Sequence, residues 1–177
     1  YTSDSQINRL GRLIHDLVDV SKLRASKLEL NIDRANLNSI VKKVLADFET
    51  EIKKSGSVVS LKEGSEISGL WDAFRIEQVI INLLTNALKY GLGKPIGIRL
   101  FRENAAVIEV TDEGIGIKSE DQFRIFEKFE RAVSGSNYGG LGLGLYISRE
   151  IVHLHRGKIF VKESPAEGST IRIELPL

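Results

Sequence analysis

The sequence has 177 residues, of which 42% are hydrophobic, and its 25 basic and 24 acidic residues leave a net charge of +1. This is long enough for one well-formed core with an appendage, and the near-neutral charge gives no support for a nucleic-acid partner. The absence of cysteine excludes disulfides and thiolate chemistry, and the spacing of the three histidines does not indicate a zinc site. No apolar run reaches the length of a membrane span. Because the chain starts at Tyr1 and contains no methionine, we expect a piece of a longer protein whose membrane or sensor segments lie elsewhere.

Residues 3–25 have the pattern of an amphipathic helix. Hydrophobic residues such as Leu10, Ile14 and Leu17 recur close to the 3.5-residue spacing of a heptad, whereas polar residues, Asp19 among them, take the other face. This apolar stripe either packs on the body of the same domain or joins a bundle with other helices. The spacing favours the bundle.

The rest of the chain mixes predicted strands and helices. Strands are expected at residues 27–35, 58–62, 96–101, 106–110, 158–162 and 170–175, and helices from an N-cap at Asn38 to near Gly56, over 76–91, from Ser119, and after Gly139 to about His155. This order predicts an α+β fold, a two-layer sandwich of a mainly antiparallel sheet with helices on one face, preceded by the N-terminal helix. The expected domain boundary separates residues 1–26 from residues 27–177.

The helix predicted over residues 76–91 has an unusual polar face. At 3.6 residues per turn one stripe collects five polar side chains: Arg75, Gln78, Asn82, Asn86 and Lys89. Asparagine forms helices weakly, so two of them one turn apart indicate either a ligand-binding face or a tolerant surface, and the stretch alone does not decide between them. Asn86, with Asn82, could offer the neutral oxygen ligands that Mg²⁺ accepts, and Lys89 could neutralise phosphate.

Two glycine-rich segments follow. Asp112 ends an apolar strand and precedes Gly114 and Gly116, so it either accepts a hydrogen bond from an amino group such as that of adenine or holds its own turn. The second segment, GGLGLGL at 139–145, lies at the start of a predicted helix, although glycine disfavours helix formation. A phosphate site would explain these glycines, because it is built from bare backbone amides at the start of a helix. It lacks the Gly-Lys-Ser/Thr of a Walker loop and the strand context of a dinucleotide fingerprint. A flexible hinge is the other interpretation.

Together these segments resemble one family, the bacterial sensor histidine kinases. NLLTNALKYG resembles the N box, DEGIGI the first glycine box, FRIFEKFERA the F box and GGLGLGL the second glycine box of their catalytic domain, which has the Bergerat-type (GHKL) ATP-binding fold. Gly168-Ser-Thr170 resembles the last glycine box, and RLIHDLVDVSKL the second helix of the dimerisation hairpin. The resemblance covers about residues 37–177, with motif order and spacing in agreement.

The resemblance implies a site for ATP and Mg²⁺. Asn86 would hold the metal, Lys89 would contact phosphate, and Lys128 and Arg131 would be lid cations at the γ-phosphate, under a lid over about residues 129–141. The remaining nucleotide-binding positions that the resemblance implies are Asn82, Tyr90, Asp112, Gly114, Gly116, Gly140, Leu141, Gly142, Leu143, Gly144 and Thr170.

The family's phosphoacceptor is missing from this chain. The family phosphorylates a histidine followed by an acid, Leu, Arg and Pro, but His15 is followed by Asp-Leu-Val-Asp, so we expect His15 to be structural. His153 and His155 are expected to be structural too. The resemblance therefore implies a protein-histidine kinase domain that binds ATP and phosphorylates a histidine outside this chain, for relay to an aspartate of a response regulator. It also implies a homodimer formed through the hairpin, and a cytoplasmic domain of a parent that could be anchored in the inner membrane.

Three alternatives stay open. A related ATPase of the same superfamily would use a glutamate on the N-box helix, but Glu77 does not share the stripe with Asn82. A serine kinase of the anti-sigma type would lack the hairpin-like first helix. A degenerate scaffold would not need Asn86, Asp112 or the glycines.

Overall fold

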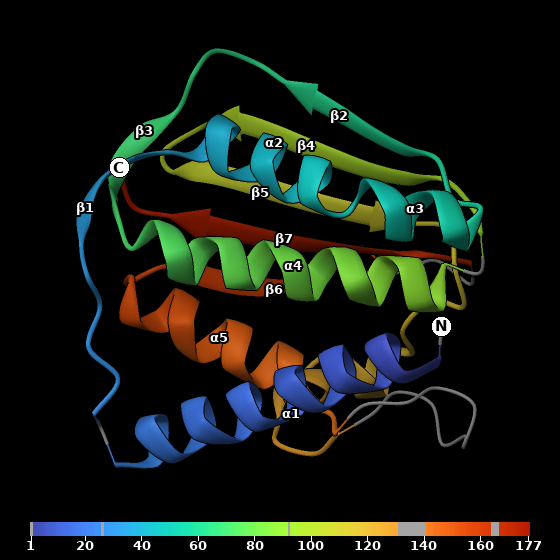
Figure 1. The fold of residues 1–177 in the computed structure, drawn as a ribbon. Coiled ribbons are helices and arrows are strands. Elements are labelled where there is room, and N and C mark those ends of the chain that lie inside the picture. Colours follow the sequence, from blue (N-terminus) through green and yellow to red (C-terminus); the bar gives the residue numbers. More distant parts are fainter. Residues whose placement is uncertain (1, 26, 92, 131–140, 164–166) are drawn as a thin grey trace.

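The computed structural model describes residues 2–25, 27–91, 93–130, 141–163 and 167–177, with the backbone alone for residues 2–9 and 12. The body has two layers, a five-stranded mixed sheet and a layer of helices over one of its faces (Figure 1), which confirms the expected α+β fold. The sheet contains β2 (Val59–Glu63), β4 (Ile96–Arg102), β5 (Ala106–Asp112), β6 (Lys158–Glu163) and β7 (Ser169–Leu175). The helices are α1 (Thr2–Arg24), α2 (Leu37–Asp47), α3 (Glu49–Ser55), α4 (Ala73–Tyr90) and α5 (Gly144–Leu154), and a separate two-stranded sheet joins β1 (Asp33–Asn36) to β3 (Ser68–Trp71).

The five strands lie in the order β2–β4–β5–β7–β6. The β4–β5, β5–β7 and β7–β6 pairs are antiparallel, and the β2–β4 pair is parallel. Alternate residues of a strand point to opposite faces, and the residues that face the helices are buried. Those of the central strands include Ile98, Leu100, Ile108, Val110, Ile171 and Ile173. The sheet therefore buries one face under the helices and keeps a polar face outside.

The segment before α2 differs from the expectation. The strand predicted over residues 27–35 is confined to β1, which pairs antiparallel with β3. The N-cap of α2 is Asn36, whose side-chain oxygen accepts a hydrogen bond from the N–H three residues on (2.9 Å), so the prediction of Asn38 as the cap was wrong. Asn38 is instead buried, and its oxygen accepts a hydrogen bond from the N–H of Ile67 (2.9 Å).

The start of α4 is tied to two distant parts of the chain. Asp72 caps the helix, and its own N–H donates to Nε2 of the buried His155 (3.0 Å). Nδ1 of His155 in turn lies 2.8 Å from the carbonyl of Ile151 and is the nitrogen that donates, so this histidine is structural, as expected. Trp71 donates through Nε1 to the carbonyl of Pro176 (2.9 Å). These bonds fix the register of α4 against α5 and the sheet.

The short helix predicted from Ser119 is two separate turns of 3-10 helix, η1 (Ser119–Asp121) and η2 (Arg124–Phe126). Phe126 is buried, whereas the side chains of Phe123 and Phe129 are 86% and 62% exposed. Phe129 also has a positive φ of 62°. The three phenylalanines do not share a face, because the two turns do not continue into one helix.

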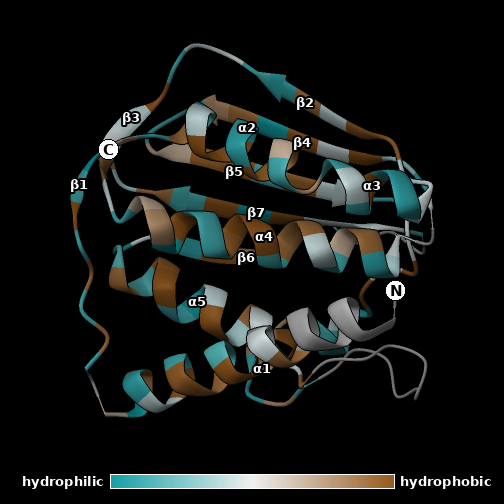
Figure 2. Cartoon of the chain, viewed as in Figure 1, coloured by the Kyte–Doolittle hydropathy of each residue, from teal (hydrophilic) through white to brown (hydrophobic). Residues whose placement is uncertain are grey.

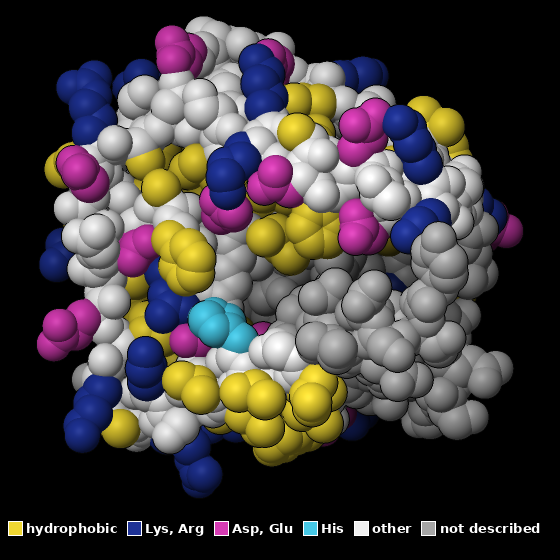
Figure 3. All heavy atoms as spheres, viewed as in Figure 1, with side chains coloured by type: hydrophobic (Ala, Val, Ile, Leu, Met, Phe, Trp, Pro, Cys, Tyr) yellow, Lys and Arg dark blue, Asp and Glu magenta, His cyan; other side chains and the backbone are white. Residues whose placement is uncertain are grey.

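Helix α1 lies against α5 and α4, with only part of its surface covered (Figures 1 and 2). Asp19 and Val20 are buried against the body, so the face that meets the body includes Asp19, on the side of the helix opposite the apolar stripe. Leu10, Ile14 and Leu17 stay at least half exposed, and Figure 3 shows hydrophobic side chains gathered along this helix. No helix in the described part of the chain combines the length and hydropathy that crossing a bilayer requires.

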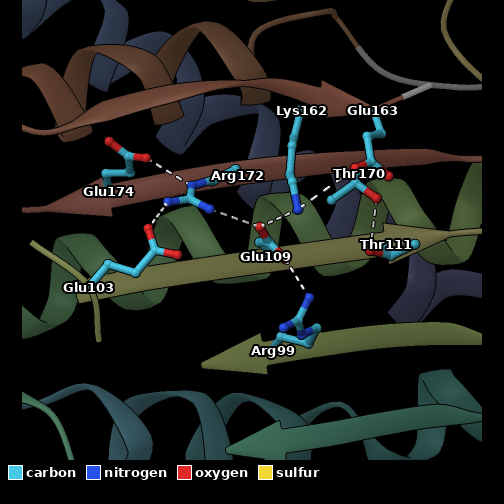
Figure 4. A network of polar contacts seen from close by, with 9 residues as sticks. All are labelled: Arg99, Glu103, Glu109, Thr111, Lys162, Glu163, Thr170, Arg172 and Glu174. Atoms are coloured by element: carbon cyan, nitrogen blue, oxygen red, sulfur yellow. Dashed lines mark hydrogen bonds and ion pairs between the residues drawn. The ribbon is translucent and has the colours of Figure 1, made fainter. Parts of the chain in front are cut away.

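An ion-pair network centred on Glu109 lies on the outer face of the sheet (Figure 4). The Glu109 side chain is 2% exposed, and its carboxylate lies 3.2 Å from Arg99, 3.1 Å from Lys162 and 3.2 Å from Arg172. The Glu103 carboxylate bonds the other side of the Arg172 guanidinium and raises the pKa of Arg172. The network joins β4, β5, β6 and β7, and a charge buried this deeply requires such compensation.

Candidate nucleotide-binding site

The polar stripe of α4 serves two different purposes. In its first half, Arg75 (2.9 Å) and Gln78 (2.7 Å) both donate to Oδ2 of Asp19 on α1. A groove of about 320 Å³ lies between α1 and α4, lined by Phe48, Phe74 and other residues. Arg75 and Gln78 therefore bind helix α1. The ligand-binding face that the sequence suggested is left to the second half of the stripe, which carries Asn82, Asn86 and Lys89.

Asn82 begins that second half and contacts α5. Its amide nitrogen donates to the carbonyl of Gly144 (3.1 Å) and to Oγ of Ser148 (3.2 Å). Ser148 is wholly buried. The N-box helix is thus joined by a side-chain amide to the helix that follows the second glycine segment.

The last turns of α4 carry Asn86, Lys89 and Tyr90, all half-buried. The Lys89 ammonium lies 3.0 Å from the Tyr90 hydroxyl and 4.6 Å from the centre of the Tyr90 ring. Such a contact holds a cation close to a ring face and limits where the lysine can reach. The side chains of Lys89 and Tyr90 therefore act together at the end of the helix.

Asp112, at the end of β5, has both carboxylate oxygens oriented by the protein. Oδ1 accepts the N–H of Gly114 (2.9 Å), and Oδ2 accepts the hydroxyl of Ser169 (2.7 Å). A carboxylate oxygen accepts more than one hydrogen bond, so each retains capacity for a further donor. Asp112 thus combines the two roles that its sequence left open, since it holds its own turn and can still accept from an amino group.

Ser169 contacts Asp112, although no motif in the sequence singles it out. The resemblance pointed to Thr170, but the Thr170 hydroxyl lies 2.9 Å from that of Thr111 on the outer face of the sheet (Figure 4). Ser169, the residue opposite Asp112 in the β5–β7 register, is on the face that Asp112 uses. Strand alternation was the available signal, because the buried Ile171 lies two residues from Ser169 and only one from Thr170.

The glycines of the first and last boxes let three backbone segments meet. A Cβ on Gly114 would lie 2.1 Å from the carbonyl oxygen of Tyr90, and one on Gly168 would lie 2.4 Å from that of Asp112. The N–H of Gly168 donates to the carbonyl of Gly114 (2.8 Å), and Gly116 has a φ of +70° that favours glycine. The loop after β5 can therefore approach the end of α4 directly, which brings Asp112 beside the last turn of the stripe.

The second glycine segment leads into α5. Gly142 has a φ of +69°, and its carbonyl accepts the N–H of Phe129 (3.2 Å). Leu143 is buried and caps α5 without a side-chain hydrogen bond, whereas Leu141 is 40% exposed. The first turn of α5 therefore has N–H groups with no side-chain cap, the arrangement that favours an anion at a helix start. Gly140 lies outside the described residues.

Of the two predicted lid cations, the structure describes one. The Lys128 ammonium lies 4.8 Å from the centre of the Tyr146 ring, on the first turns of α5. Arg131 and most of the expected lid lie outside the described residues. Lys128 is thus held close to the start of α5, where the phosphate-binding amides are expected.

These elements join several of the residues that the sequence singled out through direct contacts between the end of α4, the loop after β5, the start of β7 and the start of α5. Asn82 contacts Gly144, Tyr90 contacts the Gly114 loop, and Asp112 contacts the last glycine box. The described residues contain no group of three or more His, Cys, Asp or Glu that could hold a metal ion by itself. Amide oxygens beside a helix start with free N–H groups suit Mg²⁺ bound together with phosphate, because Mg²⁺ usually shares its coordination shell with phosphate oxygens and water. The donor set therefore fits a nucleotide bound together with its metal.

Comparison with known proteins identifies a family that matches this chain. Residues 71–177 match the model of the histidine kinase-, DNA gyrase B- and HSP90-like ATPases. The alginate biosynthesis sensor protein KinB of Pseudomonas aeruginosa is 34% identical over 99% of this chain, and the circadian input-output histidine kinase CikA of Synechococcus elongatus is 31% identical over 94%. The chain spans only 30% and 23% of these two proteins.

Solved structures of histidine kinases also resemble this chain. The histidine kinase AdeS of Acinetobacter baumannii is 28% identical, with a TM-score of 0.80 over 97% of this chain and 80% of that one. The histidine kinase ThkA, solved in complex with the response regulator protein TrrA, is 27% identical, with a TM-score of 0.75 over 96% of this chain and 48% of that one.

Proposed function

Because the chain belongs to the histidine kinase-, DNA gyrase B- and HSP90-like ATPases, as the catalytic ATPase domain of a two-component sensor histidine kinase, we propose that it binds ATP with Mg²⁺. The bound ATP would then transfer its γ-phosphoryl group to a histidine outside residues 1–177. The phosphoryl group would then pass to an aspartate of a response regulator. The observation that carries the proposal is Asp112, whose two oxygens are oriented by Gly114 and Ser169 beside the amide stripe of α4.

The residues divide into an adenine end and a phosphate end. Asp112 accepts the adenine amino group, and the glycine turns at Gly114 and Gly116 shape the pocket around it. Asn86 provides an oxygen ligand for the metal, and Lys89 neutralises phosphate charge. When bound, Mg²⁺ would neutralise charge on the phosphates. The protein's contribution is to position the γ-phosphate and to keep its own donors in place.

The second glycine segment forms the phosphate end. Backbone N–H groups of residues 140–144 donate to the triphosphate, and Lys128 and Arg131 supply positive charge near the γ-phosphate. Lys128 already lies over Tyr146 at the start of α5, which supports this role.

Partners follow from α1 and from the relatives. Residues 1–26 would form the second helix of a dimerisation hairpin, since the side chains of Leu10, Ile14 and Leu17 are at least half exposed. ThkA was solved with the response regulator TrrA, which supports a receiver domain as the phosphoryl acceptor downstream. The domain would work in the cytoplasm, and any membrane attachment would come through other segments of the parent protein.

Hydrolysis by a glutamate on the N-box helix is the weaker alternative. The carboxylate of Glu77 lies 2.5 Å from the ammonium of Lys43 on α2, and it lines the groove toward α1. Glu77 is therefore engaged away from Asp112 and Asn86, which favours phosphoryl transfer over water activation.

Titration calorimetry with ATP and Mg²⁺ tests the proposal. Asp112→Asn should weaken binding at least about tenfold, because a hydrogen bond to a charged group contributes about 1.5–3 kcal/mol. Glu113→Gln removes the neighbouring exposed carboxylate and should bind as the wild type does. Equal affinity of the wild type and Asp112→Asn would refute the site.

Phosphoryl transfer needs a second assay. With labelled ATP, this chain should incorporate no acid-labile phosphate alone but should label a separately supplied hairpin that carries the acceptor histidine. Label on His15 would show that the acceptor lies in this chain.

A further inference from the structure

The Asn82 side-chain amide is held in one orientation, and the role inferred for it below rests on the proposed function. The Asn82 amide nitrogen has two hydrogens and two acceptors, the carbonyl of Gly144 at 3.1 Å and Oγ of Ser148 at 3.2 Å. Both acceptors belong to α5, so the contact crosses from one helix to another. Neither acceptor is a group that a nucleotide would supply.

The chemistry of these partners decides which way the amide faces. A backbone carbonyl can only accept, so the atom that faces Gly144 must be the nitrogen and not the oxygen. With both hydrogens used inside the protein, the oxygen is the only part of the amide left for a ligand. A Cβ added at Gly144 would lie 3.6 Å from this oxygen, so Oδ1 stands beside the start of α5.

We propose that Ser148 is a positioning residue that fixes the amide of Asn82, so that Asn82 offers oxygen alone to the bound Mg²⁺ and its waters and does not donate to the phosphates. Ser148 is 0% exposed and cannot contact the nucleotide itself. Its effect acts through Asn82, in the way that residues behind a metal ligand orient that ligand.

A Mg²⁺ titration of ATP binding tests this. Ser148→Ala removes one acceptor and frees the amide to rotate. The Mg²⁺ concentration at half-maximal binding should then rise about tenfold, the lower end of the effect of such orienting groups. ATP binding in EDTA should be unchanged, as should the midpoint of thermal unfolding. Thr85→Ala is the matched control and should leave the Mg²⁺ midpoint unchanged, since within the described residues this hydroxyl bonds carbonyls of α4.

A double-mutant cycle separates positioning from a merely structural effect. In an Asn82→Ala background Ser148→Ala should no longer shift the Mg²⁺ midpoint, because the amide on which it acts is gone. The same shift in both backgrounds, or none in the wild-type background, would overturn the proposal while leaving ATP binding intact as a property of the domain.

Nuclear magnetic resonance tests the geometry without nucleotide. Both hydrogens of the Asn82 side-chain amide should be protected from exchange with solvent in the wild type, and one should lose its protection in Ser148→Ala. Identical exchange in the two proteins would overturn the proposal, whether or not the domain binds ATP. If the wild-type protein bound no ATP but the two proteins differed in exchange, the result would count against the proposed function and not against the role of Ser148.

Discussion

The carboxylate of Asp19 accepts a hydrogen bond from the guanidinium of Arg75, with Oδ2 and Nη1 2.9 Å apart. Asp19 is 1% exposed and Arg75 12% exposed, so the pair is almost fully removed from water. Gln78 donates to the same oxygen, and His15 lies 3.5 Å from it. This contact joins α1 to the same helix that carries Asn82 and Asn86, the asparagines that we propose bind the nucleotide and its metal. A change in the position of α1 can therefore reach α4 without passing through the sheet.

Removal of this carboxylate should be costly. Asp19→Ala leaves the Arg75 charge buried without its ion pair, and breaking such a pair costs about 3–5 kcal/mol. Chemical denaturation should show the loss in the free energy of unfolding, and hydrogen exchange should locate it on α1 and the first turns of α4. Glu29→Ala, at an exposed position, is the control and should be neutral. A loss below 1 kcal/mol in Asp19→Ala would mean that α1 is not held by this pair in solution.

Ser169 and Thr170 should differ sharply in their effect on ATP binding. Ser169→Ala removes a hydroxyl that donates to Asp112, and we expect the ATP dissociation constant to rise by up to about tenfold, because the carboxylate loses one of the two bonds that hold it in position. Thr170→Val keeps the shape of a side chain that bonds Thr111 instead, and should leave the dissociation constant unchanged. The reverse pattern in calorimetry would return the role to Thr170.

Asn86 should govern the metal dependence of binding. Asn86→Ala removes the amide oxygen that we propose as a metal ligand, so ATP affinity in saturating Mg²⁺ should fall toward the value measured in EDTA. Asn86→Asp keeps an oxygen at the same distance along the side chain and should retain Mg²⁺ dependence. Calorimetry with and without Mg²⁺ makes the comparison, and an unaltered Mg²⁺ response in Asn86→Ala would remove this residue from the metal site.

Glu109 should matter for stability and not for ATP. Glu109→Gln keeps the shape of the side chain but leaves Arg99, Lys162 and Arg172 facing an uncharged partner. We expect a loss of about 3 kcal/mol in the free energy of unfolding, with unchanged ATP affinity because the network lies on the outer face of the sheet (Figure 4). Glu103→Gln, at a side chain 53% exposed, should cost less than about 1 kcal/mol. Equal stability of the two variants would contradict the central role of Glu109.

The fold could be predicted well wherever one residue pattern had a single interpretation. The apolar side of α4 and the alternation of β7 both fixed which residues meet the core. Asn36 and Asn38 show where this failed, because both precede an apolar helical pattern and only tertiary contact with Ile67 decides which one is buried. Local sequence carries no trace of that contact.

The candidate residues of the site could be picked out one by one, but their arrangement could not. Asp112 and the glycines stand out in the sequence because their spacing is distinctive. The division of the α4 stripe could not, since Arg75 and Gln78 look like ligand-binding residues until Asp19 is found to cover them. Long-range pairs between polar residues leave no periodicity in the sequence.

The position of β7 has a consequence for how the domain is made. β7 is the last strand of the sheet in sequence, yet it lies between β5 and β6. During synthesis, β5 and then β6 therefore leave the ribosome before β7, the strand that pairs with both of them, has been synthesised. Until residue 175 has left the exit tunnel, one edge of β5 has no partner in the sheet and α5 has no complete surface to cover. Pairing between such distant segments is slow. Asp112 on β5 can therefore meet Ser169 on β7 only after β7 itself has been synthesised.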